Sequence, residues 1–302
     1  MSAARPPQPP PQDMTGKICL VTGANSGIGL VTARDLCARG AEVLMICRSQ
    51  QKGTEALDEL ESATGRRPRL YLADLSDLAQ VKRVAEEIKS NHPRLDVLVN
   101  NAGGHFPSYM ESAQGYELTF ALNHLSYFLL THHLLPLVEA AEAGRVVCVA
   151  SRAHEKSALD LSDPFFKRRA RLFKTPLVGA FLVYGTSKLL NVLFTRELAR
   201  RLKERGSRVT VNALHPGVVR TGFGKDYGGL FNLAARVLGL VSITPEQGAR
   251  TSLYLATSPE VAGVSGAYFD KCKEVQPSAT ARDPEQAARL WALSEELCVG
   301  FM

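Results

Sequence analysis

The residues that decide the fold read Thr22-Gly23-Ala24-Asn25-Ser26-Gly27-Ile28-Gly29. A short apolar run, residues 18–22, leads into them, and a run of helical periodicity, residues 28–39, follows. Glycines allow a tight turn between a strand and a helix, and they let backbone N–H groups approach an anion at the positive end of that helix. The spacing is G-x-x-x-G-x-G rather than the commoner G-x-G-x-x-G, and glycine turns also serve ordinary strand-to-helix packing. The strand-turn-helix context favours a pyrophosphate site for a dinucleotide.

The rest of the chain repeats this alternation of short apolar runs and longer helical segments. It predicts an α/β protein, a single-domain Rossmann fold whose doubly wound sheet has seven parallel strands. We expect strands at residues 18–22, 42–47, 69–72, 95–100, 145–150, 208–214 and 266–269. We expect helices at residues 28–39, 50–62, 78–91, 116–142, 184–204 and 245–257.

Three segments stand outside this rhythm. Residues 1–13 are rich in proline and are expected to form a disordered tail before one domain at residues 14–302. Residues 152–183 and 217–244 each follow the carboxyl end of a strand, where open α/β sheets bind ligands, and we expect them to wall a substrate pocket.

The chain holds no apolar run long enough to cross a membrane. Such a helix needs about 20 residues, and the best candidate, residues 122–138, is broken by histidines, an asparagine and Pro136. We therefore expect a soluble, cytoplasmic protein without a membrane-spanning segment, and leave peripheral contact with a membrane open.

Charge and cysteine content exclude other classes of site. The net charge of +6 raises the question of an anionic partner, but the densest basic run, residues 167–171, stands without a nucleic-acid motif. A solvated helix face is favoured over a phosphate or lipid contact there, so we expect no nucleic-acid partner. The six cysteines form no C-x-x-C pair, and the adjacent His132 and His133 lack a third ligand at metal spacing. We expect reduced thiols and no metal site.

The ends of the next three strands indicate which dinucleotide binds. NAD sites place a carboxylate after the second strand, whereas this chain has Cys47 and then Arg48, which suits the 2′-phosphate of NADP(H). The alternative is that Arg48 is only a surface charge. Asp74-Leu75 follows the third strand, where a carboxylate can accept a hydrogen bond from the adenine amino group. Asn101-Ala102-Gly103 follows the fourth, where small residues let the backbone pass under a ribose.

A second motif carries the chemistry. Tyr184 and Lys188 lie four residues apart, on one face of a predicted helix that Tyr184 opens. A phenol with a pKa near 10 is a weak acid–base catalyst at neutral pH, and an ammonium within about 4 to 6 Å lowers that pKa. The pair suits general acid catalysis at a carbonyl oxygen that accepts a hydride. A surface tyrosine beside a solvated lysine is the alternative. Ser151, after the fifth strand, is placed to donate to the same oxygen.

Taken in order, these motifs resemble the short-chain dehydrogenases/reductases over residues 14–269. The shared patterns are T-G-x-x-x-G-I-G, N-N-A-G, a serine after the fifth strand, Y-x-x-S-K, and a P-G turn at Pro216-Gly217. Within the family the chain is most similar to the retinol dehydrogenase group. That likeness rests on Asn123-His124-Leu125, Ser151-Arg152-Ala153-His154, residues 191–198, and Leu214-His215-Pro216-Gly217-Val218.

The resemblance implies a catalytic tetrad of Asn123, Ser151, Tyr184 and Lys188. Tyr184 would protonate the substrate oxygen, Lys188 would hold the nicotinamide ribose and lower the tyrosine pKa, Ser151 would orient the carbonyl, and Asn123 would hold a water in the proton relay. The cofactor contacts that we expect are Gly23, Asn25, Ser26, Gly27, Ile28, Gly29, Arg48, Asp74, Leu75, Asn101, Ala102, Gly103, Tyr184, Lys188, Pro216, Gly217, Val218 and Thr221. The group's preference for NADP(H) agrees with Arg48.

The expected activity is an NADP(H)-dependent interconversion of a hydrophobic aldehyde or ketone, retinoid-like by kinship, and its alcohol. The alternative is a non-catalytic NADP(H)-binding regulator or scaffold with the same fold. Family members often form homodimers or homotetramers through long helices, here residues 116–142 and 184–204. The chain departs from the group in its proline-rich tail, where a hydrophobic anchor is usual, and in Ala150, where a second serine is frequent.

Overall fold

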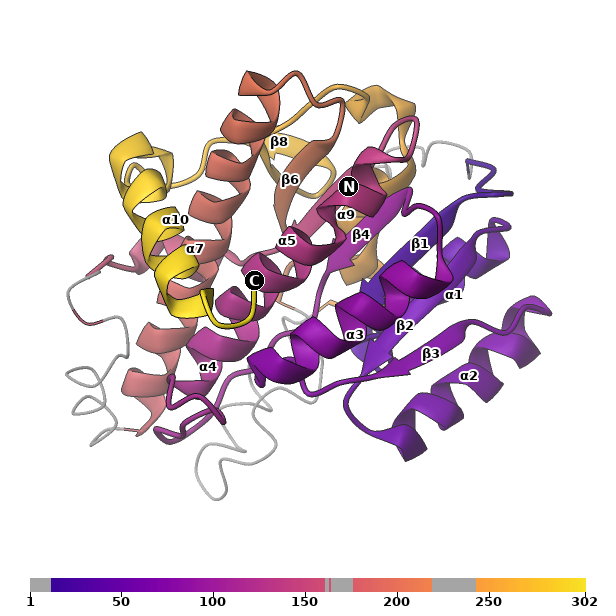
Figure 1. Cartoon of the computed structure of the whole chain (residues 1–302), viewed down its shortest axis with the longest axis horizontal. Helices are drawn as coiled ribbons and strands as arrows, with labels where there is room; N and C mark the ends of the chain where they lie inside the picture. The colour runs from indigo at the N-terminus through magenta and orange to yellow at the C-terminus, as the bar shows by residue number, and fades with distance from the viewer. Residues whose placement is uncertain (1–11, 161–162, 164–175, 219–242) are drawn as a thin grey trace, which may run out of the picture.

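The computed structural model describes residues 12–160, 163, 176–218 and 243–302. One sheet runs through it, in the order β3-β2-β1-β4-β5-β6-β7-β8 (Figure 1). Its strands are β1 (Ile18–Thr22), β2 (Glu42–Cys47), β3 (Arg69–Leu72), β4 (Val97–Asn100), β5 (Arg145–Val149), β6 (Thr210–His215), β7 (Tyr268–Asp270) and β8 (Lys273–Val275). The first seven are parallel, and the strand order reverses between β1 and β4. Ligands of such sheets bind at the carboxyl ends of the strands, where the order reverses.

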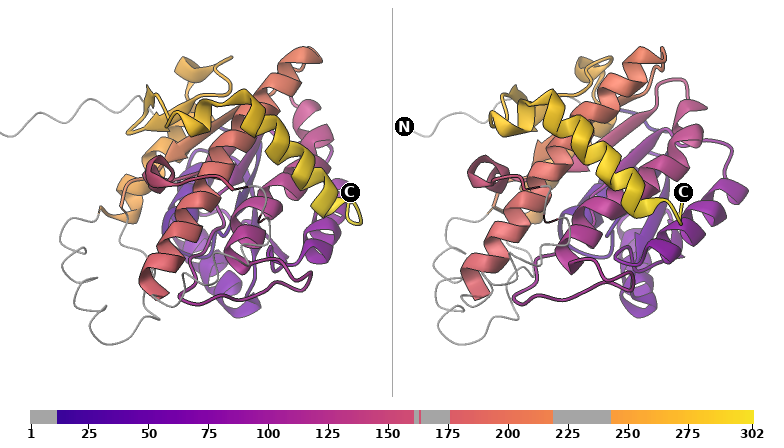
Figure 2. Two further views of the ribbon diagram at one scale, coloured as in Figure 1. Left: turned by 90° about the vertical axis from the view of Figure 1, so that its left-hand side faces the viewer. Right: turned by 60° about the vertical axis from the view of Figure 1, so that its left-hand side comes forward.

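Helices cover both faces of the sheet, as Figure 2 shows from the side. They are α1 (Gly27–Ala38), α2 (Gln50–Thr64), α3 (Leu78–Asn91), α4 (Leu118–Phe120), α5 (Ser126–Glu139), α7 (Pro176–Glu204), α9 (Pro245–Thr257) and α10 (Pro284–Cys298). One apolar core joins the sheet to α3, α5, α7 and α10, and a second joins it to α1, α2 and α9. Central strands such as β1 and β4 are buried along their whole length, which explains their unbroken apolar sequence. The predicted α/β class and doubly wound sheet are confirmed.

The prediction of seven parallel strands was one strand short. The eighth, β8, pairs antiparallel with β7 at the edge of the sheet. The two-residue turn between them places Lys271 and Cys272 at φ values of 52° and 61°. Hairpin turns of this kind usually carry Asn-Gly or Asp-Gly, so the Lys271-Cys272 pair did not predict a hairpin. All three residues of β8 are exposed, and it therefore lacks the apolar pattern of a buried strand.

Two predicted helices have different bounds. The one expected at residues 116–142 is divided into α4, a π-helical turn η1 (Ala121–Leu125), and α5. The helix expected to open at Tyr184 begins at Pro176, so Tyr184 lies inside α7. Proline is favoured in the first turn of a helix, because its missing N–H is not needed there. The segment 152–183, expected as a pocket wall, therefore contains the start of α7 and a 3-10 turn, η2 (Arg152–Lys156).

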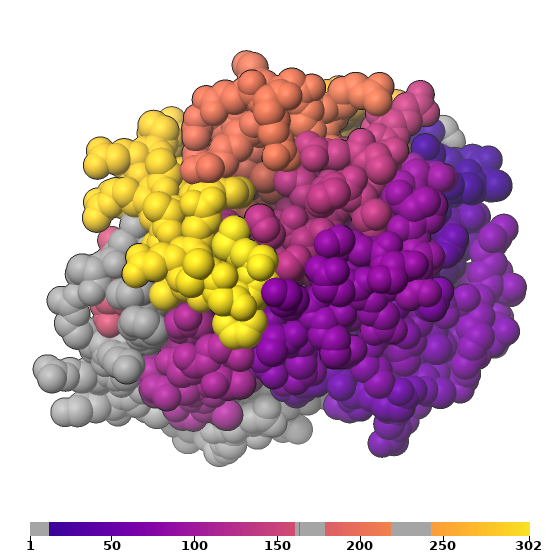
Figure 3. All heavy atoms as spheres, viewed as in Figure 1, coloured from indigo at the N-terminus to yellow at the C-terminus, as the bar shows by residue number. Residues whose placement is uncertain are grey.

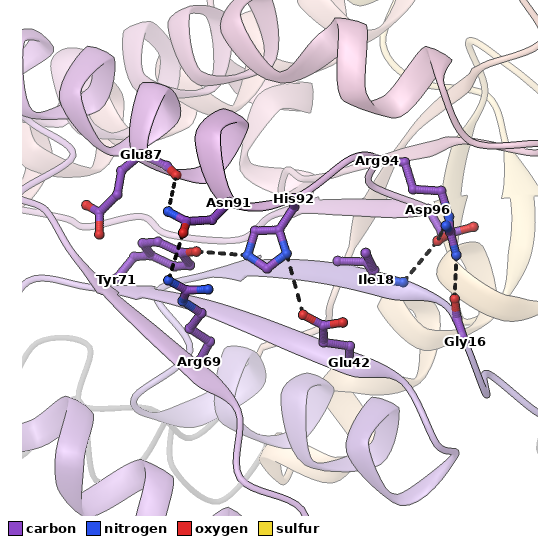
Figure 4. A network of polar contacts seen from close by, with 10 residues as sticks. All are labelled: Gly16, Ile18, Glu42, Arg69, Tyr71, Glu87, Asn91, His92, Arg94 and Asp96. Carbon is purple, nitrogen blue, oxygen red and sulfur yellow. Dashed lines mark hydrogen bonds and ion pairs between the residues drawn. The ribbon is translucent and has the colours of Figure 1, made fainter.

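The amino-terminal edge of the sheet is closed by polar contacts (Figure 4). The buried carboxylate of Asp96 accepts hydrogen bonds from the backbone N–H of Ile18 (2.9 Å) and from Nε of Arg94 (3.2 Å). Nearby, His92 shares a 2.8 Å hydrogen bond with the Tyr71 hydroxyl. The backbone N–H of Ile18 at this edge is thus satisfied by a buried side chain, whereas the opposite edge carries the polar groups described below.

The C-terminal helix α10 packs against α7 through the buried residues Ala287, Leu290, Ser294 and Cys298. Figure 3 shows its atoms (yellow) on the surface beside those of α7 (orange). Subunit contacts were expected on the helices at residues 116–142 and 184–204, and part of that face is occupied by α10 of the same chain.

Within the described residues, no helix is both long enough and apolar enough to span a membrane. The tail at residues 1–11, the basic run at residues 167–171 and Thr221 lie outside the described residues. The cysteines are free thiols, and all but Cys272 are buried.

Candidate active site

The turn after β1, residues 22–29, lies directly against the loop after β4. The Thr22 hydroxyl accepts hydrogen bonds from the backbone N–H groups of Asn101 (2.9 Å) and Ala102 (2.8 Å). In return, Nδ2 of Asn101 donates to the Thr22 carbonyl at 2.7 Å. Two segments that lie far apart in the sequence are therefore fixed side by side at the carboxyl edge.

Glycine is required in this turn for two separate reasons. Gly23 and Gly27 have φ values of +64° and +56°, a conformation that residues with a Cβ rarely adopt. At Gly29 the backbone is ordinary, but a Cβ would collide with the Gly23 carbonyl oxygen and with Nδ2 of Asn101. The start of α1 consequently lies against the turn with no space for a side chain between them.

The amino-terminal end of α1 is left open. Its N-cap residue, Ser26, makes no side-chain capping hydrogen bond, and its first turn holds no acidic residue. By contrast, α2, α3, α9 and α10 each begin with a side chain that accepts a hydrogen bond from the first turn. Backbone N–H groups at the start of α1 therefore lack a side-chain cap, and they combine with the positive end of the helix dipole to suit a phosphate group.

Arg48 and Asp74, expected to contact different parts of a dinucleotide, form an ion pair with each other. NH1 of Arg48 lies 3.7 Å from Oδ2 of Asp74, and their side chains are 72% and 32% exposed. The Asp74 carboxylate also accepts hydrogen bonds from the backbone N–H (3.0 Å) and hydroxyl (2.6 Å) of Ser76, while Leu75 is buried. An exposed ion pair contributes about 0–1 kcal/mol, so Arg48 can exchange Asp74 for a phosphate at small cost.

Asn123 lies in the π-helical turn η1 and is fully buried. Its Oδ1 accepts from the Gly104 N–H (2.8 Å), and its Nδ2 donates to the Gly104 carbonyl (3.0 Å) and to the Ser187 hydroxyl (2.9 Å). The side chain therefore links the loop after β4 to α7. Single π turns are frequent at functional sites because the wider turn changes where side chains point.

Lys188 is buried beneath this loop. Its ammonium donates to the Val149 carbonyl at 3.0 Å and lies 5.7 Å from the centre of each of the Tyr127 and Tyr184 rings. A Cβ on Gly103 would stand 3.3 Å from Nζ of Lys188 and 3.2 Å from Oδ1 of Asn123. Gly103 thus keeps the space in front of both groups open. Burial lowers the pKa of Lys188 to about 8.

Tyr184 projects from α7 toward Ser151, which follows β5. Burial raises the pKa of the Tyr184 phenol to about 12, and a hydrogen bond with the Ser151 side chain acts in the opposite direction. The expectation that Lys188 lowers this pKa is not met, because desolvation of the phenolate outweighs the other contributions. A phenol with this pKa keeps its proton at neutral pH, as a general acid must before it donates.

Three residues that contact the tetrad were missed in the sequence. Gly104 and Ser187 bind Asn123, and the His105 ring packs edge-to-face on Tyr184 with 5.6 Å between ring centres. Burial lowers the pKa of His105 to about 4, so its imidazole is neutral. The position of Ser187 beside Lys188 in Y-x-x-S-K was a usable signal, whereas the positions of Gly104 and His105 depend on how the loop folds back.

The loop after β6 forms the remaining described part of the site. Gly217, in the P-G turn, has a φ of +94°, and the Val218 carbonyl accepts a hydrogen bond from the Ile243 N–H (2.8 Å). The Val218 side chain is 59% exposed. His215, at the end of β6, accepts a hydrogen bond at Nδ1 from the Arg152 N–H (3.3 Å) and so shapes the adjoining loop.

Trp291, on α10, packs on the body of the protein. It stacks on Phe194 and lies under the guanidinium of Arg201. His133, one of the adjacent histidines, hydrogen-bonds to the Phe301 carbonyl. Both residues hold the C-terminal segment rather than the candidate site. A cavity of about 460 Å³ between α5, α7 and α10 is lined by neither Tyr184 nor Lys188.

Comparisons with known proteins agree with this geometry. A family model described as short chain dehydrogenase matches residues 17–162. Retinol dehydrogenase 14 of Mus musculus is 41% identical over 304 residues, which cover 96% of this chain and 87% of that protein. Dehydrogenase/reductase SDR family member 13 of Homo sapiens is 40% identical over 291 residues, or 94% of this chain and 74% of that one.

A solved structure of an uncharacterized protein from Mycobacterium Paratuberculosis is similar over 95% of both chains, with a TM-score of 0.76 and 34% identity. Sequence and fold therefore agree over nearly the whole length. The chain belongs to the short-chain dehydrogenase family and is retinol dehydrogenase-like.

Proposed function

We propose that the protein is an NADP(H)-dependent oxidoreductase that interconverts a hydrophobic aldehyde or ketone and its alcohol. The observation that carries the proposal is the convergence of Asn123, Ser151, Tyr184 and Lys188 at one place. They come from η1, from the end of β5 and from α7, and they meet beside the loop that packs against the glycine turn. A binding protein without turnover has no use for this combination.

The described residues fit a dinucleotide cofactor. The open N-terminus of α1 receives the pyrophosphate, with Gly23, Asn25, Ser26, Gly27, Ile28 and Gly29 around it. Asp74, Leu75, Asn101, Ala102 and Gly103 line the adenosine side, and Pro216, Gly217, Val218 and Thr221 are the proposed contacts of the nicotinamide. The nicotinamide, when bound, gives or takes the hydride.

Arg48 is the residue proposed to favour NADP(H) over NAD(H). It follows β2, where an NAD site carries a carboxylate for the ribose 2′-hydroxyl. Its guanidinium is 72% exposed and holds Asp74 only loosely, at 3.7 Å. A 2′-phosphate offers it more negative charge than that single carboxylate and a geometry suited to two parallel hydrogen bonds.

The proton moves through Tyr184. In the direction of reduction, its hydroxyl gives a proton to the substrate oxygen, while Ser151 holds that oxygen by a hydrogen bond. The buried ammonium of Lys188 lies 5.7 Å from the centre of the Tyr184 ring and is the proposed partner of the ribose hydroxyls. Asn123, bonded to Gly104, anchors the loop above Lys188 and is the proposed holder of a relay water.

The substrate is proposed to be lipophilic. Two large apolar side chains at this end of the molecule, Phe181 and Met110, are 51% and 47% exposed. The segments proposed as pocket walls, residues 152–183 and 217–244, include further apolar residues such as Phe223 and Leu230. Retinoids are the leading candidates because several relatives are named retinol dehydrogenases.

The first test is equilibrium binding of NADPH and NADH to the parent, to Arg48→Asp and to Arg289→Asp, a control that reverses an exposed arginine on α10. The parent should bind NADPH at least about tenfold more tightly, which corresponds to about 1.4 kcal/mol. Arg48→Asp should lose this preference and Arg289→Asp should keep it. Failure of both nucleotides to bind the parent, or equal preference in all three proteins, contradicts the proposal.

The second test is NADPH oxidation with a panel of hydrophobic aldehydes and ketones that includes retinal. Turnover of at least one of them is expected. If NADPH binds and the panel, run in both directions, gives no turnover, the non-catalytic binding protein becomes the better account.

A further inference from the structure

His154 lies three residues after Ser151 and is fully buried. It contacts two backbone groups that are far apart in the sequence. Its Nδ1 is 2.7 Å from the Ser151 carbonyl oxygen, and its Nε2 is 3.2 Å from the backbone nitrogen of Ser278. The edge of the Tyr268 ring packs against the imidazole, with 4.9 Å between ring centres. His154 therefore contacts the residue that follows β5, a residue of β7 and the segment that follows β8.

These two partners fix the protonation state of the ring. A carbonyl oxygen only accepts hydrogen bonds, so Nδ1 must carry a hydrogen. A backbone N–H only donates, so Nε2 must be unprotonated and accept. A cationic imidazole would place one N–H against another at Ser278. Burial acts in the same direction, because it lowers the pKa of His154.

Ser278 begins a C-terminal segment, residues 278–302, that contacts the site at a second point. His124 is also fully buried, and its Nε2 lies 2.9 Å from the hydroxyl of Ser294 on α10. The Ser294 hydroxyl donates to the Leu290 carbonyl, so Nε2 of His124 must be the donor in this pair. His124 directly follows Asn123 in the π turn η1.

The C-terminal segment thus contacts two histidine side chains, His154 and His124, that lie near Ser151 and Asn123 in the sequence. It is secured elsewhere by a hydrogen bond from the Tyr116 hydroxyl to the Leu297 carbonyl (2.8 Å) and by Leu290 and Cys298 in the apolar core. Figure 2 shows this segment crossing the outer face of α7. The segment is therefore fixed to the body of the protein at several points, and a positioning contact can depend on it.

We propose that His154 is a positioning residue for Ser151, held in place by the C-terminal segment. This inference rests on the proposed oxidoreductase function. Ser151 has extended backbone and its hydroxyl also accepts from the Ala153 N–H (3.2 Å). The Ser151 carbonyl accepts hydrogen bonds from the His154 backbone N–H (3.1 Å) and from Nδ1 of the His154 ring (2.7 Å), so the ring adds a second contact that fixes the backbone from which the Ser151 side chain projects toward Tyr184.

Two conservative variants separate the two bonds of His154. In His154→Asn, the side-chain nitrogen can take the place of Nδ1 and donate to Ser151. In His154→Gln, the side-chain oxygen can take the place of Nε2 and accept from Ser278, but the side-chain bond to Ser151 is lost and only the backbone N–H of residue 154 still donates to that carbonyl. We expect kcat for carbonyl reduction to fall about tenfold in the Gln variant, the equivalent of one hydrogen bond of about 1.4 kcal/mol, and to stay within about twofold in the Asn variant. The Kd for NADPH should not change in either.

A merely structural histidine would behave differently. Both variants would then lose activity in proportion to their fall in Tm, and the Gln variant would not be worse. Equal kcat losses in the two variants, or a larger loss in the Asn variant, would overturn the proposal.

A measurement without turnover keeps this inference distinct from the proposed function. The ¹⁵N chemical shifts of His154 in the full-length parent should show a ring that is protonated at Nδ1 and mostly neutral at about pH 6.5, where an ordinary histidine is half charged. The Ser278 amide should exchange slowly with solvent. A ring protonated at Nε2, or a Ser278 amide that exchanges freely, overturns the positioning role even in an active enzyme. A parent that turns over no carbonyl refutes the proposed function instead.

Discussion

Replacement of Asn123 by alanine tests whether this residue supports the site structurally as well as chemically. The substitution removes the partner of the Gly104 N–H, of the Gly104 carbonyl and of the Ser187 hydroxyl. Leaving a buried polar group unpaired costs about 1–3 kcal/mol. Gly104 is only half-buried and water can replace part of the loss, so we take about 1 kcal/mol for each bond, or about 3 kcal/mol in total.

The matched variant is Asn123→Asp, which has the same shape. It keeps the bond from the Gly104 N–H but sets a carboxylate oxygen against the Gly104 carbonyl. Urea unfolding of the parent and both variants should show large losses of unfolding free energy, and kcat for carbonyl reduction should fall in both. If Asn123→Ala unfolds at the same urea concentration as the parent, these three hydrogen bonds do not support the loop and the structural part of the reasoning is wrong.

Three further outcomes follow from the charges and burial described above. In the cofactor-free protein, Lys188 should titrate near pH 8 and Tyr184 near pH 12. NADPH binding should therefore weaken above pH 8, as the Lys188 ammonium loses its charge, and a Kd that is constant from pH 7 to 9.5 would contradict this. Burial lowers the pKa of His124 to about 3, so on acidification the unfolded chain binds this proton first, and this residue alone should lower the unfolding free energy by about 1.4 kcal/mol per pH unit below about 6.5. His124→Gln should reduce the slope of unfolding free energy against pH, and an unchanged slope would count against this contribution. Asp96→Ala leaves the Ile18 N–H without its partner, so it should lower the free energy of unfolding in urea by about 1–3 kcal/mol. The Kd for NADPH should not change, because this contact lies at the edge of the sheet opposite the site, and a shift in Kd would show that the two edges are coupled.

The parts of the fold that could be predicted are those in which local sequence and tertiary burial agree. β1 is buried on both faces and reads as an unbroken apolar run, and its register with β2 is that of an ordinary parallel pair. β8 was missed because it is short, exposed and joined by a turn without glycine. The start of α7 was misplaced because residues 176–183 were assigned to the segment 152–183, which interrupts the alternation of strand-like and helix-like runs in the sequence.

In the candidate site, too, local sequence predicts some residues, whereas other contacts depend on the tertiary structure. The motifs placed the glycine turn, Ser151, Tyr184 and Lys188, because each stands at the end of a strand or at helical spacing. The pairing of Arg48 with Asp74 depends on how neighbouring strand ends meet, and the edge-to-face contact of His105 with Tyr184 depends on the path of a loop. The pKa of Tyr184 was expected to be low because a lysine stands four residues away. Burial is a property of the folded chain, and it raises that pKa.

The central claim, that Tyr184 is the acid in hydride transfer to a carbonyl, is tested most directly by single-turnover stopped-flow kinetics. Enzyme loaded with NADPH is mixed with an aldehyde that the parent reduces, and loss of nicotinamide absorbance is followed for the parent, for Tyr184→Phe and for Tyr254→Phe, a control on α9. We expect Tyr184→Phe to bind NADPH as the parent does and to transfer hydride about 10²–10⁴-fold more slowly, with Tyr254→Phe unaffected. Hydride transfer at the parent rate in Tyr184→Phe would contradict the account.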